Sequence, residues 1–454
     1  MISEAPISKL RTSLRGQLLL PTDSGYDDAR RIHNGSIDRR PAAIARCAGT
    51  ADVVASVRIA REHDLLVSVR GGGHSIAGKA VCDGGLMIDL SAMKGIRVDS
   101  IARTARAQPG LVLGEFDRET QAFSLATTMG VVSRTGISGL TLGGGIGWLV
   151  RKHGLACDNL ISADVVTADG QVLTASATQH EDLFWGLRGA GANFGIVTSL
   201  EYRLHELGTI FGGGILFPVE KIRDIARLWR DFTATCPDEL ATQLVTVTFP
   251  ELGRVVGIAC CYAGLLSEGE KLLKPLRSFG SPAADLLGPM PYIQLQSMFD
   301  PFFPPGRHAY TKSNFLKALS DDALDAFCGY ATAPSPFNSG VLEHLGGVFA
   351  RVAPDATAFA HRCYPYNFSI WSNWESAAET ETNIRWSRAF WEAMKPFMGA
   401  GAYVNYLEDE ADPQSREAYG GNYHRLVEVK NKYDPTNFFR MNHNIKPTRS
   451  AVAV

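Results

Sequence analysis

Val67-Ser68-Val69-Arg70-Gly71-Gly72-Gly73-His74-Ser75 is the stretch around which this chain is organised. The apolar run that begins at Leu65 predicts a short strand, and three consecutive glycines follow it. Because glycine has no side chain, successive backbone N–H groups in such a loop can face an anion such as a pyrophosphate. His74 then projects from a loop whose backbone can lie against a large cofactor. Taken alone, the stretch is equally consistent with a tight turn that carries a surface histidine.

Four further stretches favour the cofactor interpretation. They are Gly139–Gly147 (GLTLGGGIG), Lys152–Asn159 (KHGLACDN), Leu183–Val197 (LFWGLRGAGANFGIV) and Tyr433–Ile445 (YDPTNFFRMNHNI). Together with the RGGGHS loop they resemble the FAD-linked oxidases of the vanillyl-alcohol-oxidase (PCMH) superfamily. The order and composition are most similar to the berberine bridge enzyme-like branch, in the subgroup of 6-hydroxy-D-nicotine oxidase. This resemblance implies an α+β fold with two lobes, a PCMH-type FAD-binding domain and a substrate domain with an antiparallel sheet and helices on one side.

Length and composition set limits on the class of protein. A chain of 454 residues is long enough to form two lobes. The net charge of −2 gives no reason to expect nucleic acid or an anionic membrane as a partner. The first 20 residues lack the apolar run of a secretory signal, and no membrane-spanning run follows. The eight cysteines include no CxxC pair, so we expect reduced thiols, no metal site and a cytoplasmic protein.

A shift in composition after Leu207-Gly208, together with the return that the family resemblance implies from about Tyr419, divides the chain into three parts. Residues 1–207 form the expected FAD-binding domain, 208–418 the substrate-binding domain, and 419–454 a segment that returns to the first domain. The sequence of the first part predicts a strand–helix–strand unit that ends at the glycine loop. A GxGxxG dinucleotide motif would need glycine at two positions that are occupied by Ile76 and Phe194. A nicotinamide cofactor is therefore not expected.

The composition changes after Leu207-Gly208, and we interpret Gly212-Gly213-Gly214, near the start of the second part, as marking this boundary. An amphipathic helix is predicted over 219–233, followed by antiparallel strands over 244–249 and 255–262. The proline-rich stretch 289–305 is predicted to be a long loop over the site.

The resemblance implies that FAD is bonded covalently to the histidine of the glycine loop, here His74. A neutral imidazole is a suitable nucleophile for the flavin 8α position. Many relatives carry a second bond through a cysteine, but the aligned residue is Val132, which cannot form a thioether. Cys157 stands where relatives carry alanine, and we interpret it as a small buried residue. We therefore predict attachment through His74 only.

The resemblance also assigns further residues to the cofactor. Glycines would allow close approach of the backbone, Ser138 would offer a hydroxyl, and the C-terminal asparagines would return to the flavin. The full set is Arg70, Gly71, Gly72, Gly73, His74, Ser75, Gly78, Gly136, Ser138, Gly139, Gly143, Gly144, Gly195, Val197, Asn442 and Asn444.

Two residues are candidates for the chemistry of the substrate. Tyr403-Val-Asn-Tyr406 resembles a family motif whose second tyrosine is the proposed base, which assigns that role to Tyr406. A phenol has a reference pKa of about 10, so nearby cations or the flavin would have to lower it. We place Tyr406 on a strand, with Asn405 facing the opposite side. Asn367 aligns roughly with a residue that faces the flavin, whereas Ile146 replaces a second family tyrosine.

The expected function is that of an FAD-dependent oxidase. Such an enzyme takes a hydride from a carbon that bears an OH or an amine and returns the electrons to O₂. A flavin-dependent dehydrogenase or an oxidative cyclase is the alternative among enzymes, and a flavin-binding protein without turnover is the alternative of another class. A small-molecule substrate and a monomer or homodimer are expected.

Overall fold

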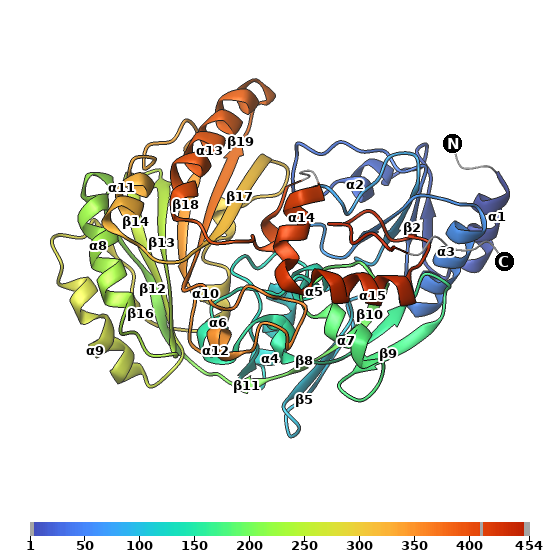
Figure 1. Cartoon of the computed structure of the whole chain (residues 1–454), viewed down its shortest axis with the longest axis horizontal. Coiled ribbons are helices and arrows are strands. Elements are labelled where there is room, and N and C mark those ends of the chain that lie inside the picture. The colour runs from blue at the N-terminus through green and yellow to red at the C-terminus, as the bar shows by residue number, and fades with distance from the viewer. Residues whose placement is uncertain (1–3, 409–411, 449–454) are drawn as a thin grey trace.

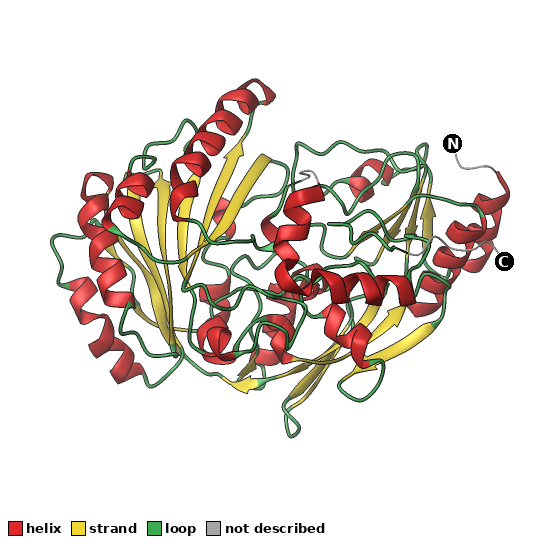
Figure 2. Cartoon of the chain, in the orientation of Figure 1, coloured by secondary structure: helices red, strands yellow, loops and turns green. Residues whose placement is uncertain are grey.

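The computed structural model describes residues 4–408 and 412–448, and these form two lobes that lie side by side (Figure 1). Both lobes contain sheets and helices, and Figure 2 shows the longer helices of the second lobe gathered on one side of its sheet. The mixed α+β architecture predicted from the sequence is confirmed.

The first sheet of the first lobe carries the glycine loop. Its strands are, in spatial order, β1 (Gln17–Leu19), β2 (Ala43–Arg46), β4 (Leu86–Asp89) and β3 (Val67–Arg70). Strands β2 and β3 run parallel to β4 and are joined through α3 (Thr50–Glu62), so the strand–helix–strand unit is confirmed. Helix α3 buries Val53, Val57 and Ala60, while α1 (Glu4–Ser13) and α2 (Tyr26–Arg30) complete this part. The loop begins where β3 ends.

The second sheet of the first lobe is antiparallel. Its strands are β5 (Ile96–Asp99), β6 (Thr104–Ala107), β10 (Ile196–Arg203), β8 (Leu160–Val166) and β9 (Val172–Ser176), and β7 (Leu125–Ala126) pairs separately with β11 (His205–Glu206). Its helices are α4 (Leu113–Gln121), α5 (Ile137–Leu142), α6 (Val150–His153), η1 (Ala156–Asn159) and α7 (Glu181–Leu187). A hairpin turn at Asp169-Gly170 joins β8 to β9, and Gly170 supplies the positive φ of 76° that the turn needs.

The second lobe is built on one antiparallel sheet of eight strands. They are β15 (Ala284–Asp285), β12 (Ile210–Pro218), β14 (Gly253–Tyr262), β13 (Leu240–Phe249), β18 (Ser339–His344), β19 (Tyr366–Trp374) and β17 (His308–Leu316), with β16 (Gly288–Met290) paired to β12. The helices are α8 (Ile222–Thr233), α9 (Leu266–Arg277), α10 (Tyr292–Gln296), α11 (Asp321–Cys328), α12 (Val348–Arg351) and α13 (Thr380–Met394), with short turns η2 (Val219–Lys221), η3 (Asp300–Phe302), η4 (Ala377–Glu379), η5 (Lys395–Phe397) and η6 (Val404–Tyr406).

Strand alternation divides the residues of this sheet between two environments. Leu244, Leu342 and Phe368 share a core with Ile225 and Trp229 of α8, so the helices cover that face. The intervening residues point to the opposite face, which looks toward the first lobe (Figure 2). This face, which α10 and the segment around η3 cover in part, borders the space between the lobes.

Three details differ from the sequence interpretation. Gly212-Gly213-Gly214 is not a boundary but the interior of β12, where a Cβ on Gly213 would lie 2.2 Å from the Leu286 carbonyl oxygen. The stretch 289–305 is not one long loop, because it contains part of β16, α10 and η3. Tyr406 lies in η6 rather than on a strand.

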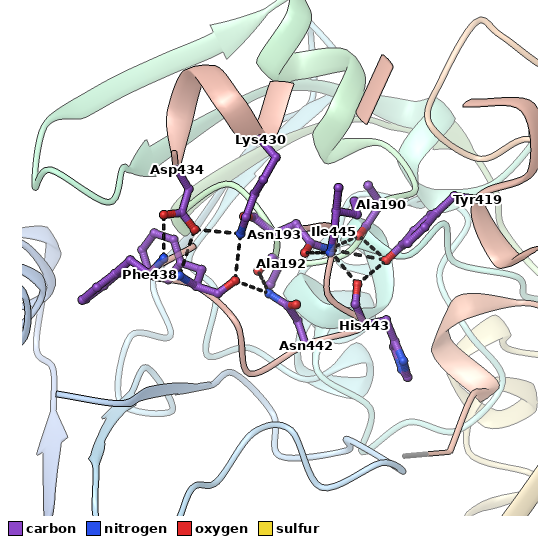
Figure 3. Close-up of polar contacts among 11 residues, drawn as sticks. Ala190, Ala192, Asn193, Tyr419, Lys430, Asp434, Phe438, Asn442, His443 and Ile445 are labelled. Atoms are coloured by element: carbon purple, nitrogen blue, oxygen red, sulfur yellow. Dashed lines mark hydrogen bonds and ion pairs between the residues drawn. The ribbon is translucent and has the colours of Figure 1, made fainter. Parts of the chain in front are cut away.

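The C-terminal segment lies against the first lobe. Helix α14 (Asp412–Tyr419) leads into it, and it contains η7 (Gly420–Asn422) and α15 (Tyr423–Tyr433). The buried Lys430 ammonium donates to Asp434 (2.7 Å) and to the carbonyls of Asn193 and Phe439 (2.8 and 2.9 Å), as Figure 3 shows. The Asn193 side chain in turn accepts from the Ile445 amide at 3.0 Å. This network fixes the last described residues beside the loop that contains Asn193.

Candidate active site

A cavity lies between the glycine loop and the face of the second-lobe sheet that borders the first lobe. Its first-lobe wall comes from residues 71–77, 130–140 and 190–193, and residues 441–443 of the C-terminal segment close one side. Its second-lobe wall comes from β13, β18, the segment around η3 and the segment 403–407. Both lobes therefore contribute to one site.

The glycine loop presents free backbone donors to this cavity. Among the described residues, none of the amides from Gly71 to Ser75 donates a hydrogen bond to the protein. A Cβ on Gly72 would lie 2.5 Å from the Gly136 Cα, so two glycine loops touch here. Gly73 has a φ of 72°, which favours glycine. Unpaired consecutive amides form the anion-binding concavity that a pyrophosphate requires, and these residues therefore fit FAD.

His74 lies at the end of this loop as a half-buried ring stacked on His33, with the ring centroids 4.0 Å apart. Burial, with a smaller contribution from His33, lowers the pKa of His74 to about 3, so the imidazole is neutral at pH 7. Its Nε2 atom is buried without a partner within the described part of the chain. A neutral ring with an unpaired nitrogen is competent as a nucleophile.

The other predicted cofactor residues fall into two groups. Ser75, Gly136, Gly139 and Asn442 line the cavity together with Gly71–His74. Eight residues do not line it: Arg70, Gly78, Ser138, Gly143, Gly144, Gly195, Val197 and Asn444.

Several residues of the second group support the walls from behind. Arg70 donates to the Ala29 carbonyl at 2.5 Å, and Ser138 donates to the Pro109 carbonyl at 3.0 Å. A Cβ on Gly143 would lie 2.0 Å from Asn405 Oδ1. The shapes of the glycine loops depend on these contacts.

The remaining members of that group lie further away. Gly78 packs against Ile37, Gly144 against Phe359, and Gly195 against Val165. Val197 is buried in β10, and Asn444 lines a separate cavity with His361 and Lys446. These residues are not brought together with the glycine loop.

Two positions bear on a second cofactor bond. Val132 lines the cavity. Cys157 does not line it and is fully buried, which confirms the interpretation of a small buried residue. Burial raises the pKa of the Cys157 thiol above its ordinary value, so the thiolate is disfavoured.

Tyr403 and Asn405 tie the segment of Tyr406 to the first lobe. The Tyr403 hydroxyl accepts from the amides of Gly145 (2.9 Å) and Ile146 (3.2 Å). The Asn405 amide donates to the Leu140 carbonyl and to the Tyr403 hydroxyl. Asn405 lines the cavity like its neighbours, so the expected strand alternation at this place is wrong.

Tyr406 faces the cavity with its ring held between two aromatic neighbours. Trp371 and Tyr403 each lie 4.7 Å from it, in edge-to-face geometry. Burial raises the pKa of Tyr406 well above 10, and nearby Glu343 raises it further. Among the described residues no cation lowers this pKa, and the phenol is protonated at neutral pH.

Glu343 is the functional candidate that the sequence interpretation missed. It is 4% exposed, lies on β18 and lines the cavity. Its carboxylate accepts from Gln243 Nε2 (3.1 Å) and from Asn367 Nδ2 (2.5 Å). Burial raises its pKa to about 7, although the Asn367 hydrogen bond opposes this. Asn367 is fully buried behind Glu343 and does not line the cavity, so it positions the carboxylate.

Within residues 4–408 and 412–448, no group of three or more histidine, cysteine or acidic side chains is arranged to hold a metal ion. None of the helices described is both long and apolar enough to cross a membrane.

Comparisons with known proteins agree with this geometry. Residues 41–176 match the model of the FAD binding domain, and residues 402–446 match the model described as berberine and berberine like. The chain is 33% identical to the FAD-linked oxidoreductase YgaK of Bacillus subtilis, over 97% of this chain and 99% of that protein. It is 32% identical to (R)-6-hydroxynicotine oxidase of Paenarthrobacter nicotinovorans, over 98% and 100% of the two chains.

Solved structures show the same similarity. The crystal structure of 6-hydroxy-D-nicotine oxidase from Arthrobacter nicotinovorans superimposes with a TM-score of 0.88 at 30% identity, over 96% of this chain and 98% of that one. A chitooligosaccharide oxidase superimposes with a TM-score of 0.88 at 26% identity, over 98% and 100%.

Proposed function

Because the chain belongs to the berberine bridge enzyme-like family of FAD-linked oxidoreductases, we propose that it is an oxidase of a small molecule. The substrate would carry a C–OH or C–NH centre, and O₂ would be the electron acceptor. One observation carries this proposal. The free amides of Gly71–Ser75 lie on one wall of the cavity, and Tyr406 and Glu343 lie on the opposite wall. When bound, FAD supplies the hydride acceptor and the reaction with O₂.

We further propose that FAD is attached covalently through His74 alone. The neutral ring and the unpaired Nε2 atom support a bond at this residue. Val132 on the cavity wall and the buried Cys157 support the absence of a second bond. Peptide mapping should find flavin on the His74 peptide only, and flavin on a peptide that contains Cys157 would contradict this part of the proposal.

On the substrate side, Glu343 and Tyr406 would assist removal of the proton from the substrate oxygen or nitrogen. Loss of a hydride builds positive charge on the substrate, and removal of the proton from its oxygen or nitrogen relieves that charge. With a pKa of about 7, the Glu343 carboxylate can take up a proton at physiological pH. The Tyr406 hydroxyl, protonated at this pH, would contact the substrate, while Asn367 and Gln243 hold the carboxylate in place.

Peroxide release tests the proposal. Purified protein with bound flavin should release H₂O₂ and consume O₂ with at least one member of a panel of alcohols, cyclic amines and sugars. Reduction of the flavin without peroxide release would indicate a dehydrogenase instead. If no compound on the panel reduces the flavin, the assignment as an oxidase of such substrates fails.

A further inference from the structure

The first-lobe segment 33–36 lies between the glycine loop and the second lobe. On one side, the His33 amide donates to the Gly73 carbonyl at 2.8 Å. On the other side, the His33 carbonyl accepts from the Gly306 amide at 3.0 Å. The Asn34 side chain both donates to and accepts from the backbone of Ala309, at 3.2 and 3.1 Å. The backbone of His33 is therefore fixed by hydrogen bonds to both lobes.

The side chain of His33 stacks on the imidazole of His74. The ring centroids lie 4.0 Å apart, and the ring planes make an angle of 27°. Burial lowers the pKa of His33 to about 4, with a smaller contribution from Arg134, so both rings are neutral at pH 7. Imidazole nitrogens donate and accept in the plane of the ring, so two rings that meet through their faces do not exchange a hydrogen bond. The contact therefore sets the orientation of the His74 ring.

This orientation bears on the reactivity of His74. Within residues 4–408 and 412–448, His33 is the one ring that stacks on His74, and His74 Nε2 has no hydrogen-bond partner. An imidazole without such a neighbour is free to populate several rotamers, and the stack selects among them. Reacting atoms must be held about 3–3.5 Å apart and aligned, and a displacement of about 1 Å can slow a reaction about 100-fold.

The neutral state of His33 is also suited to this position. When Nε2 of a neutral imidazole forms a bond to carbon, the ring carries a positive charge until its other nitrogen loses a proton. A neutral aromatic face attracts such a charge, whereas a cationic neighbour would repel it. Because His33 is uncharged at pH 7, it can lie against His74 throughout the reaction.

We propose that His33 is the positioning residue for the attachment of FAD at His74. Its ring holds the His74 imidazole in the orientation from which Nε2 forms the bond. The inference rests on the proposed attachment through His74. The net reaction joins Nε2 to the flavin 8α carbon, removes one hydrogen from each partner, and passes two electrons and two protons to O₂, which becomes H₂O₂. His33 is not the proton acceptor, because its ring face and not its nitrogens meets His74.

Three substitutions of His33 and one control test the role of the stack. His33→Phe keeps an aromatic face, His33→Ala removes it, and His33→Leu fills much of the space without a ring. The control is His308→Ala, which removes a second histidine from the same contact between the lobes, where its Nδ1 atom lies 3.1 Å from Ser36 Oγ. Each full-length protein is purified from riboflavin-limited cells and incubated with FAD in air. Absorbance gives the bound flavin, and the share that stays with acid-precipitated protein gives the covalent fraction over time.

We expect His33→Ala to bind FAD but to attach it at least about tenfold more slowly than the unaltered chain. His33→Phe should attach it at close to the unaltered rate, and His308→Ala should match the unaltered chain. Normal attachment in His33→Ala, or slow attachment in His33→Phe, would overturn the inference and leave the attachment at His74 standing.

Two further outcomes are also decisive. If His33→Ala does not retain flavin, the comparison of His33→Leu with His33→Phe takes its place: slower attachment with leucine supports the stack, and equal rates overturn it. Absence of acid-stable flavin from the unaltered protein would refute the proposed attachment itself, and the role of His33 with it.

Discussion

Replacing Glu343 by glutamine should change both the pH dependence of stability and the rate of flavin reduction. The carboxyl is 4% exposed, and burial raises its pKa from 4.5 to about 7. At about 1.4 kcal/mol per pH unit, this shift corresponds to about 3 kcal/mol. Below pH 4.5 the carboxyl is protonated in both the folded and the unfolded chain. As the pH rises toward 7, only the unfolded chain ionises, so the folded state loses stability until the folded carboxyl ionises too.

Denaturant unfolding at pH 5 and pH 8 measures this effect. The unaltered chain should lose about 2–3 kcal/mol more than Glu343→Gln between the two pH values. The constant cost of exchanging a carboxylate for an amide cancels in this difference. Glu220→Gln, whose carboxyl is exposed, should behave like the unaltered chain.

Rapid-reaction measurement of flavin reduction gives the functional half of the prediction. The rate in the unaltered enzyme should rise with pH through about 7, where Glu343 becomes ionised. Glu343→Gln should remove this rise and slow reduction by about 10² to 10⁴, the usual contribution of a positioned base. An unchanged rate, or the same pH dependence of stability in both proteins, would refute the assignment of Glu343.

Three further substitutions test other parts of the site. Tyr406→Phe keeps the ring packing but deletes the hydroxyl, so flavin reduction should slow by about 10² or more while flavin content is unchanged; a normal rate would leave Tyr406 as a packing residue. Gly72→Ala places a Cβ 2.5 Å from the Gly136 Cα, so absorption spectra of the purified protein should show loss of bound flavin. Asp434→Asn leaves the buried Lys430 charge uncompensated and should lower the free energy of unfolding by about 3–5 kcal/mol, whereas a loss below 1 kcal/mol would mean that this pair is not important for stability.

The architecture was largely predictable because its elements have strong local signals. Helix α8 was recognised from the spacing of Ile222, Ile225 and Trp229, and all three are buried as expected. The glycine loop after β3 was assigned to the cofactor only together with the four further stretches, because three glycines and a histidine alone are equally consistent with a tight turn. In contrast, Gly212–Gly214 has nearly the same composition as Gly71–Gly73 but lies inside β12. Glycine composition alone does not distinguish a loop from a strand that is closely approached by another backbone.

The substrate side of the site was harder to predict because it depends on tertiary contacts. Tyr403-Val-Asn-Tyr406 has high strand propensity, yet hydrogen bonds of Tyr403 and Asn405 to the first lobe hold it as a short 3₁₀ turn. One feature of the sequence could have indicated Glu343. Strand alternation places it on the same face as Val341, and an acidic residue is unusual beside a buried valine. Its neighbours Gln243 and Asn367 come from strands far away in sequence, so the raised pKa was not visible without the structure.

Mass spectrometry of the tryptic peptide 71–79 tests most directly whether the cavity between the lobes holds a covalently attached FAD. Trypsin cleaves after Arg70 and Lys79, so this peptide contains His74 and no cysteine. We predict that, in protein purified with its flavin, the peptide mass increases by one FAD less two hydrogens, and that His74→Ala releases the flavin on acid precipitation. A peptide of unmodified mass, with the flavin recovered free in the supernatant of the unaltered protein, would contradict the attachment and with it the role of His74.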